Sequence, residues 1–271
     1  MKKLMFTAAV AAAGLAFGIE SANTVGYTMQ DWMSKSTYYM MGGQFEATDG
    51  TSIKLSSINF GDLSGAPTFT EFFDEDMNIV GSAPQVQIAF ADSEGFTPYY
   101  YLADGAADMV SPSWVDVGGN PADPEIIAGL GFWFNNPVSN APVVTTAGAI
   151  VGDAAVEKTF DNTYRVLVNP YPVATKLSEI SFAGIVAAAP TFTEFFDEDM
   201  NIVGTAPQIQ VPYADGEGFA PYYYLSDGAA DMVSPSWVDV GGNPADPTIP
   251  VGRGCWFKPA ASSMTVTFTA P

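Results

Sequence analysis

Short apolar and alternating runs, separated by turn residues, extend along most of the chain. Gly, Pro, Asn and Asp bound these runs, and this pattern is typical of antiparallel strands joined by turns. The predicted strands of the N-terminal half are Val25–Met29, Tyr38–Phe45, Gln85–Phe90, Tyr99–Leu102 and Gly131–Phe134. Those of the C-terminal half are Tyr164–Val168, Gln208–Tyr213, Tyr222–Leu225, Gly254–Phe257 and Met264–Phe268.

Helical periodicity is rare along the chain. Phe69, Phe72 and Phe73 have helical spacing, so the run FTEFFDEDM predicts one short helix. LSSINF from Leu55 and LSEISF from Leu177 could each form a single helical turn. Many short strands with few helices predict an all-β, mainly antiparallel fold, arranged as β-sandwiches or partly open barrels.

A long segment of the chain occurs twice. Ala66–Phe134 recurs as Ala189–Phe257, and 13 of the 69 aligned positions differ. A weaker match extends upstream, where KLSSINF from Lys54 corresponds to KLSEISF from Lys176. Such self-similarity indicates a tandem duplication and hence two similar β domains.

The expected boundary between the two domains lies in NNPVSNAPVVTTAG from Asn135, whose Pro, Asn and Thr content is typical of a linker. The predicted domains are residues 23–137 and 138–271. The downstream part of each repeat is nearly unchanged, whereas the upstream part has diverged. Either the downstream surface functions twice, or the copying of this part is recent.

The N-terminus has the layout of a secretory signal peptide. Two lysines precede an apolar run from Leu4 to Phe17, followed by small residues and a polar exit. We expect residues 1–22 to be removed, with cleavage after a residue between 16 and 22. The run is shorter than the ~20 residues of a membrane span, and no later segment is longer. The mature chain is therefore expected to lack a transmembrane segment and to be secreted or held in the cell envelope.

Composition and charge narrow the classes of partner. The chain is 48% hydrophobic and 13% aromatic, which favours a folded protein over a disordered one. Nine cationic residues against thirty acidic ones give a net charge of −21. Such a chain has no basic patch for phosphates, so nucleic acid is excluded as a partner. Cations and basic surfaces are better candidates.

Histidine is absent and cysteine occurs once, at Cys255. The lack of histidine excludes Ser-His-Asp and Cys-His catalysis and imidazole zinc sites, and a single cysteine excludes an internal disulfide. Phe132 holds the equivalent position in the first repeat, so we expect Cys255 to fill a buried apolar slot. Phosphate-binding glycine loops and nucleophile-elbow motifs are also missing.

The acidic run FDEDMN is a candidate calcium site. Alternating oxygen-bearing side chains in a turn can point several ligands at one hard cation, although the run departs from an EF-hand because it lacks the glycine and the final acidic residue. The alternative is a solvated acidic turn. The candidate ligands are Asp74, Asp76 and Asn78, with Asp197, Asp199 and Asn201 in the second copy.

A second carboxylate group surrounds DGAADMVSPSWVDVGGN. Two of these carboxylates could act as acid and base in glycoside hydrolysis, but Asp-Gly and Gly-Gly-Asn are also ordinary turn formers. Two near-identical active sites without a cationic partner argue against catalysis, so no catalytic residue is assigned. The residues are Asp104, Asp108 and Asp116, and Asp227, Asp231 and Asp239.

Three consecutive tyrosines in each repeat must alternate between the two faces of a strand. Together with a following tryptophan, they could form a flat platform for a sugar ring, or they could pack in a core or an interface. The candidate ligand-binding residues are Tyr99, Tyr101 and Trp114, and Tyr222, Tyr224 and Trp237.

The order of these features resembles a loose group of secreted bacterial proteins without an assigned activity. The shared features are a leader ending near SANTVGY, a Tyr-rich middle, a Trp before a Gly-rich loop, and a closing GLGFWF or GRGCWF strand. The resemblance implies an extracytoplasmic location and transfers no functional residue.

The sequence thus predicts an exported, non-catalytic structural or adhesive protein. Calcium is its candidate cofactor, envelope proteins or glycans are candidate partners, and a homo-oligomer remains open. A carbohydrate-binding protein is the alternative, and a glycoside hydrolase is the third hypothesis.

Overall fold

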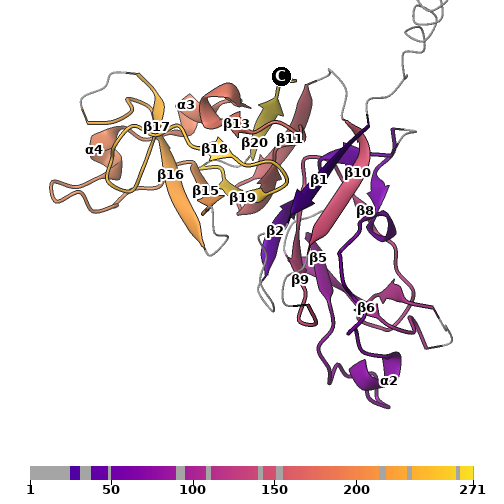
Figure 1. Cartoon of the computed structure of the whole chain (residues 1–271). Helices are drawn as coiled ribbons and strands as arrows, with labels where there is room; N and C mark the ends of the chain where they lie inside the picture. Colours follow the sequence, from indigo (N-terminus) through magenta and orange to yellow (C-terminus); the bar gives the residue numbers. More distant parts are fainter. Residues whose placement is uncertain are drawn as a thin grey trace, which may run out of the picture.

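The computed structural model describes residues 25–30, 38–47, 50–89, 95–107, 111–139, 143–150, 155–213, 218–230, 234–260 and 263–270. The regular secondary structure of this part of the chain is mainly antiparallel strands, which form two β units (Figure 1). The predicted all-β class is therefore confirmed. The expected signal peptide, Asp108 and Asp231 lie outside the described residues.

The first unit contains a five-stranded sheet, a three-stranded sheet and a two-stranded ribbon. The five-stranded sheet has the order β2 (Tyr39–Gly42), β9 (Gly131–Asn135), β5 (Gln85–Ala89), β6 (Phe96–Leu102) and β7 (Ser113–Val115). The other strands are β1 (Val25–Gln30), β10 (Val144–Ile150) and β3 (Phe45–Glu46) in the second sheet, and β4 (Ile53–Lys54) with β8 (Glu125–Ile126). The short helices are η1 (Leu55–Ser57) and α2 (Phe69–Phe72).

The second unit repeats the strand order of the first. Its five-stranded sheet is β12 (Arg165–Val168), β19 (Gly254–Lys258), β15 (Gln208–Pro212), β16 (Phe219–Leu225) and β17 (Ser236–Val238). The other strands are β11 (Val156–Asp161), β20 (Ser263–Phe268) and β14 (Ser181–Phe182), and the ribbon β13 (Thr175–Lys176) with β18 (Thr248–Ile249). The helices are η2 (Leu177–Glu179), α3 (Ile185–Ala188) and α4 (Phe192–Phe195).

Strand pairing extends the first unit beyond the boundary expected at residue 137. The segment expected to be a linker contains β10, which pairs with β1 from Val25 opposite Ala149 to Gln30 opposite Val144. β11 then pairs with β20 at the far end of the chain. The first unit therefore closes with β10, and the second begins with β11.

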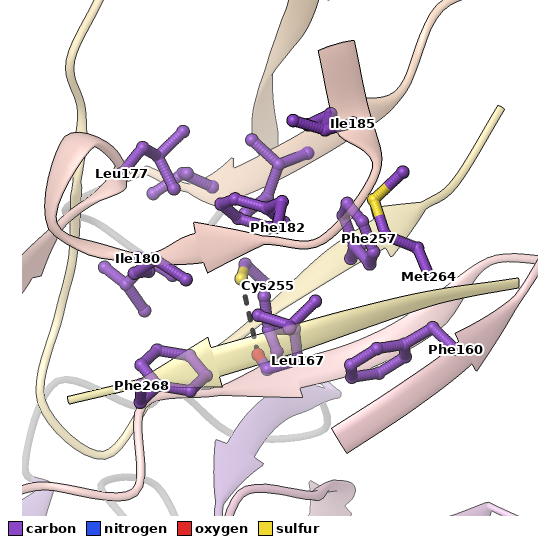
Figure 2. Packing of buried hydrophobic residues seen from close by; sticks show 14 of the residues in the cluster. Phe160, Leu167, Leu177, Ile180, Phe182, Ile185, Cys255, Phe257, Met264 and Phe268 are labelled. Atoms are coloured by element: carbon purple, nitrogen blue, oxygen red, sulfur yellow. Dashed lines mark hydrogen bonds between the residues drawn. The ribbon is translucent and has the colours of Figure 1, made fainter. Parts of the chain in front are cut away.

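The main core of each unit lies between its five-stranded and three-stranded sheets. In the second unit, Phe160 and Phe268 of the three-stranded sheet pack with Leu167 and Phe257 of the five-stranded sheet (Figure 2). Cys255 belongs to the same cluster, is fully buried and donates its S–H to the Leu167 carbonyl at 3.3 Å. The predicted buried slot is confirmed, and burial raises the pKa of this thiol far above its usual value.

The short helix α2 covers part of the opposite face of the first five-stranded sheet. Its first turn is closed by Glu71, whose carboxylate accepts hydrogen bonds from the Thr68 N–H at 2.8 Å and the Thr68 hydroxyl at 2.9 Å. Phe72 packs on Tyr100 with ring centroids 4.7 Å apart. Tyr100 therefore lies on this second face, while Tyr99 and Tyr101 pack against the main core.

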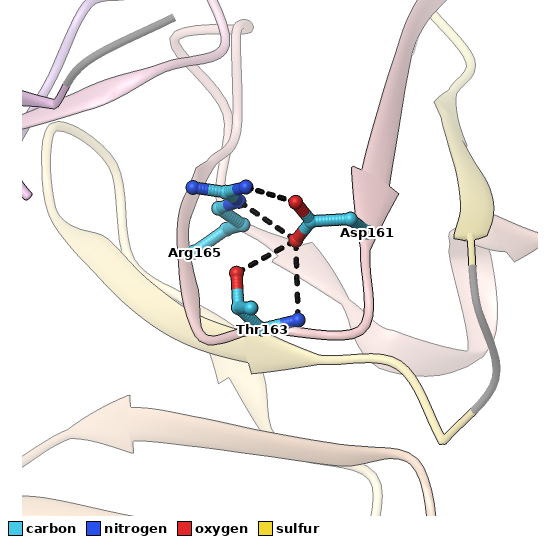
Figure 3. A network of polar contacts seen from close by, with 3 residues as sticks. All are labelled: Asp161, Thr163 and Arg165. Atoms are coloured by element: carbon cyan, nitrogen blue, oxygen red, sulfur yellow. Dashed lines mark hydrogen bonds and ion pairs between the residues drawn. The ribbon is translucent and has the colours of Figure 1, made fainter. Parts of the chain in front are cut away.

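The turn between β11 and β12, which leads from the three-stranded to the five-stranded sheet, is held by a charged carboxylate (Figure 3). The Asp161 carboxylate accepts hydrogen bonds from the Thr163 hydroxyl at 2.6 Å, the Thr163 N–H at 3.1 Å and the Arg165 guanidinium. These donors, Arg165 first, lower the pKa of Asp161 to about 2. A charged carboxylate is thus the preferred state of this turn.

Aromatic side chains join the two units. Trp133 of β9 and Trp256 of β19 meet with ring centroids 5.7 Å apart. Each tryptophan also contacts a phenylalanine of the other unit, Trp133 with Phe219 and Trp256 with Phe96, and both pairs have a centroid distance of 6.4 Å. From the sequence, Trp133 and Trp256 are expected only to belong to the closing strand of each repeat. In the structure they lie between the units.

Glycines bring the two sheets close together. A side chain added at Gly131 would lie 2.0 Å from Val166 Cγ1, and one added at Gly254 would lie 2.6 Å from Met40 Cγ. Only glycine leaves space for this approach, as expected where one backbone meets another element. Inter-unit backbone hydrogen bonds connect Gly42 N to Gly252 O at 3.1 Å and Val168 N to Gly129 O at 3.4 Å.

Helices in the described ranges are all short. None of them is long and apolar enough to cross a membrane.

Candidate functional site

The second unit carries a cavity beside Trp237. Its volume is about 630 Å³, within the range of small-molecule sites. The residues that line it come from the η2 to α3 segment, from β16 and β17, and from the loop before β18. They are Leu177, Ser178, Ile180, Phe182, Ile185, Tyr224, Pro235, Ser236, Trp237, Pro244, Ala245 and Asp246.

The first unit has a cavity at the equivalent place, with a volume of about 980 Å³. Ten of the residues that line it have counterparts of the same type that line the cavity of the second unit, and these ten form the floor of the site. The shared lining residues are Ser56, Ile58, Phe60, Tyr101, Pro112, Ser113, Trp114, Pro121, Ala122 and Asp123. Two matching concave sites are thus built from the repeated sequence.

Strand register brings the predicted tyrosine and tryptophan together at both cavities. Tyr101 on β6 lies opposite Trp114 on β7, and Tyr224 on β16 lies opposite Trp237 on β17. The rings meet edge to face, with centroids 5.4 Å apart in the first unit and 5.3 Å in the second. Four of the six predicted aromatic residues therefore line the two cavities.

The tryptophans do not form a flat exposed platform. Trp114 and Trp237 are each 5% exposed, because Phe60 and Phe182 pack against them at centroid distances of 5.1 and 5.3 Å. An indole on a strand next to the core is covered by the opposing segment, and only part of it reaches the cavity. Tyr99 and Tyr222 pack against the core on the same face of their strands but do not line either cavity.

The cavities have few polar side chains, and these are mainly serines and aspartates. Asp246 accepts hydrogen bonds from the Ser178 N–H at 2.9 Å and the Ser178 hydroxyl at 2.8 Å, and Asp123 holds Ser56 in the same way. Ser236 Oγ is buried in the second cavity and has no hydrogen-bond partner among the described residues. A buried hydroxyl without a partner is costly, so a polar ligand atom would satisfy it.

The hydroxyls of the cavity tyrosines stay protonated over the physiological range. Burial raises the pKa of Tyr101 and of Tyr224 above its usual value. Both phenols can therefore donate as well as accept a hydrogen bond.

The walls of the two cavities differ. In the first unit the wall is a polar turn, in which Asp62 accepts hydrogen bonds from the Ser64 N–H at 3.0 Å and the Ser64 hydroxyl at 2.6 Å. In the second unit this segment is one residue longer and forms the short helix α3, and its Ile185 lines the cavity. The two sites share a floor but have walls of different polarity.

The candidate calcium ligands lie in a closed loop. Asp74 accepts hydrogen bonds from the backbone N–H groups of Asp76 at 3.0 Å and Asn78 at 2.8 Å, and from the Asn78 side-chain amide. The second copy is the same around Asp197, Asp199 and Asn201. The Asn78 side-chain amide first, then the backbone donors, lower the pKa of Asp74. The alternation of Asp and Asn in these runs is therefore explained by hydrogen bonds that close the loop.

The run DVGGN forms a loop of the same type. Asp116 accepts hydrogen bonds from the N–H groups of Gly118 and Asn120, both at 2.9 Å, and from the Asn120 amide. Both loops need a left-handed residue at the fourth position, which is Met77 in one and Gly119 in the other. Methionine costs energy in this conformation, and the two loops touch there, because an added Gly119 Cβ would lie 2.8 Å from Met77 Cε.

The other predicted carboxylates also have local roles. Asp104 and Asp227 each accept a hydrogen bond at 2.7 Å from the N–H of the first residue of α2 or α4. Within the described ranges, no three acidic or cysteine side chains are grouped so that they could hold a metal ion. Calcium binding therefore stays a prediction, in which Asn78 and Asn201 would have to turn their oxygens inward.

Comparisons with known proteins give no relative for this chain: no family model, curated protein or solved structure matches it.

Some cavity residues escaped the sequence analysis. Ser113, Ser236, Asp123 and Asp246 were not singled out, although each lies in a stretch that is identical in the two repeats. Identity between the repeats was the available signal, but it did not separate site residues from turn residues.

Proposed function

We propose that this chain is an exported, non-catalytic adhesive protein that binds glycans through two equivalent cavities. The observation that carries the proposal is the repeated floor, with tyrosine, tryptophan, serine and aspartate at matching positions in both units. The location outside the cytoplasm rests on the sequence of the N-terminus.

The chemistry of the cavities favours a sugar. Aromatic edges and aliphatic side chains cover the apolar faces of a sugar ring, while carboxylate and hydroxyl groups exchange hydrogen bonds with its hydroxyls. The exposed carboxylates of Asp123 and Asp246 can still accept such bonds on their free lone pairs. The strongly acidic chain disfavours anionic glycans, so the proposed ligands are neutral ones.

The experiment is a screen of the mature chain, residues 23–271, on an array of neutral oligosaccharides. Replacing Trp114 or Trp237 by alanine would remove a core ring, and such substitutions cost about 3–5 kcal/mol. The better variants are Ala122→Phe and Ala245→Phe, which fill the cavities from half-buried positions. We expect each to weaken binding at its own site by more than about tenfold, equivalent to ~1.4 kcal/mol.

Circular dichroism and thermal unfolding serve as the control, because both variants should keep the wild-type spectrum. Glycan retention that is unchanged in the double variant would remove the cavities as the binding sites. Retention by none of the arrayed glycans would reject the function itself.

Calcium and hydrolysis are tested on the same material. A rise of several degrees in melting temperature with calcium, reversed by chelator, would support the calcium-stabilised form of the proposal, because a ligand that binds only the native state stabilises it. Release of reducing ends from the retained glycan would replace the adhesive function with the glycoside hydrolase.

A further inference from the structure

Several contacts between the two units are reciprocal, although the hydrogen bond from the Gln44 side chain to the Tyr171 carbonyl at 3.2 Å has no counterpart among the described residues. Leu130 bridges to Leu167, and at the equivalent positions Arg253 bridges to Met41. Three further kinds of contact occur in matching pairs, in which the two units swap roles. They are the two backbone hydrogen bonds between the units, the two Trp–Phe pairs and the two glycine contacts. When residue i of one unit meets j of the other and j meets i, the units are related by a two-fold axis. The central Trp133–Trp256 pair lies where this axis passes.

The cavities lie at the outer edges of this arrangement. Trp114 is on β7 and Trp237 is on β17, and these strands are the sheet edges opposite to β2 and β12. The inter-unit contact is formed by β2, β9 and Phe96 at the start of β6, together with their counterparts in the second unit. Each tryptophan strand is four strand spacings, or ~19 Å, from β2 or β12. Both units therefore separate the two cavities, and α2 and α4 likewise lie far apart in Figure 1.

A two-fold axis restricts what can occupy both cavities. The line that joins two points related by such an axis is perpendicular to it, so a rotation of 180° reverses any direction along that line. A glycan has distinguishable reducing and non-reducing ends. A straight glycan that enters one cavity correctly would therefore run through the other in the wrong direction.

We propose that each chain binds two separate glycan strands and so cross-links them. This inference rests on the proposed function, because it takes the cavities as glycan sites. It adds that the protein joins polymers to each other instead of clamping one polymer at two places. Two working sites on one chain then link two strands, and this link is lost when only one site binds.

The test uses three soluble neutral polysaccharides as probes: dextran, galactomannan and glycol chitin. Affinity electrophoresis measures binding, and light scattering and viscosity measure cross-linking. The wild-type chain is compared with Ala122→Phe and Ala245→Phe, which each leave one cavity open, and with the double variant. The single variants also control for oligomers, because an oligomer with one open site per chain would still cross-link.

We expect a retained polysaccharide to form large particles with the wild-type chain, with a maximum at intermediate protein ratios and a decline in excess protein. The polysaccharide should still slow the migration of each single variant in the gel. Each single variant should lose at least about nine-tenths of the increase in light scattering, since a bivalent bridge needs both sites. The double variant should neither bind nor scatter.

Two results would overturn the inference while leaving the proposed function intact. One is binding of the wild-type chain without cross-linking at any ratio. The other is cross-linking by the single variants at the wild-type level. If none of the three polysaccharides slows the migration of the wild-type chain, glycan binding is rejected, and the cross-linking with it.

Discussion

The inter-unit contact predicts that Gly131→Ala is more destabilising than Gly254→Ala, although the two glycines occupy equivalent positions. The new methyl at residue 131 would lie 2.0 Å from Val166 Cγ1 and 2.9 Å from the Met41 carbonyl oxygen. At residue 254 the nearest atoms are Met40 Cγ at 2.6 Å, and Met40 Sδ and Val166 Cγ1, both at 2.8 Å. Carbon atoms prefer to be about 3.5–4.0 Å apart, so both sites are overpacked.

The difference between the sites lies in what can move. Val166 is a neighbour of both positions, but the new methyl at residue 131 would approach its Cγ1 to 2.0 Å and the one at residue 254 only to 2.8 Å. Valine is branched at Cβ and is confined to few rotamers, and a backbone carbonyl cannot withdraw. The closest neighbour at residue 254 is Met40, and methionine is flexible and adapts to its surroundings. Overpacking costs about 1–3 kcal/mol. We expect Gly131→Ala near the upper end of this range and Gly254→Ala near the lower end. For a chain of this size, each kcal/mol lowers the melting temperature by about 2–4 °C.

Urea unfolding of the mature chain measures both effects, and a double-mutant cycle with Val166→Ala tests the cause. If the clash is with Val166, shortening that side chain should recover part of the loss in Gly131→Ala, with a coupling of about 0.5–3 kcal/mol. Equal losses at the two glycines, or additive behaviour with Val166→Ala, would refute this account of the interface.

Three further outcomes follow from the structure. Cys255 should not react with a thiol reagent in the native chain and should react fully in denaturant, because burial raises the pKa of its thiol; rapid native labelling would contradict this. Asp161→Asn should destabilise the chain at neutral pH. Since the folded pKa is lowered from 3.8 to about 2, the difference from wild type should be constant above about pH 4 and should vanish as the pH falls toward 2 in acid titrations of stability. Gly119→Ala should lower stability by more than ~1 kcal/mol, because it combines a positive φ with the Met77 contact; unfolding measurements that show no loss would exclude this explanation of the loop.

Local pattern was enough to predict the strands whose alternation is strong. β9 and β20 lie within one residue of the expected Gly131–Phe134 and Met264–Phe268. Polar and apolar residues alternate in β20, and β9 is a short apolar run that begins at a glycine. β6 begins at Phe96 and not at the expected Tyr99. Pro98 caused the difference, because proline normally ends a strand, yet here it pairs with Gln87 inside the ladder.

Long-range pairing could not be read from the sequence. β10 contains Gly148 and follows a Pro- and Asn-rich stretch, so it looked like a linker. It forms a strand because β1, more than a hundred residues earlier, supplies its partner. Gly148 also allows β3 to approach, since a Cβ there would lie 2.5 Å from the Glu46 carbonyl oxygen.

The candidate site was predictable only in part for the same reason. The pairing of Tyr101 with Trp114 follows from two neighbouring strands, and both residues were named from the sequence. The cavity itself also needs the segment around Phe60, which arrives from a different part of the chain and covers the indole. Burial of the tryptophan is therefore a property of the assembled unit.

Holding both units in one polypeptide has a consequence that two separate copies could not provide. A symmetric dimer of identical subunits dissociates on dilution and must change both of its sites together. Here the contact across Trp133 and Trp256 is intramolecular, so its formation is independent of protein concentration. The wall with Asp62 can also change while that with Ile185 is kept. Under the proposed function, one molecule therefore joins two different strands even when it is dilute.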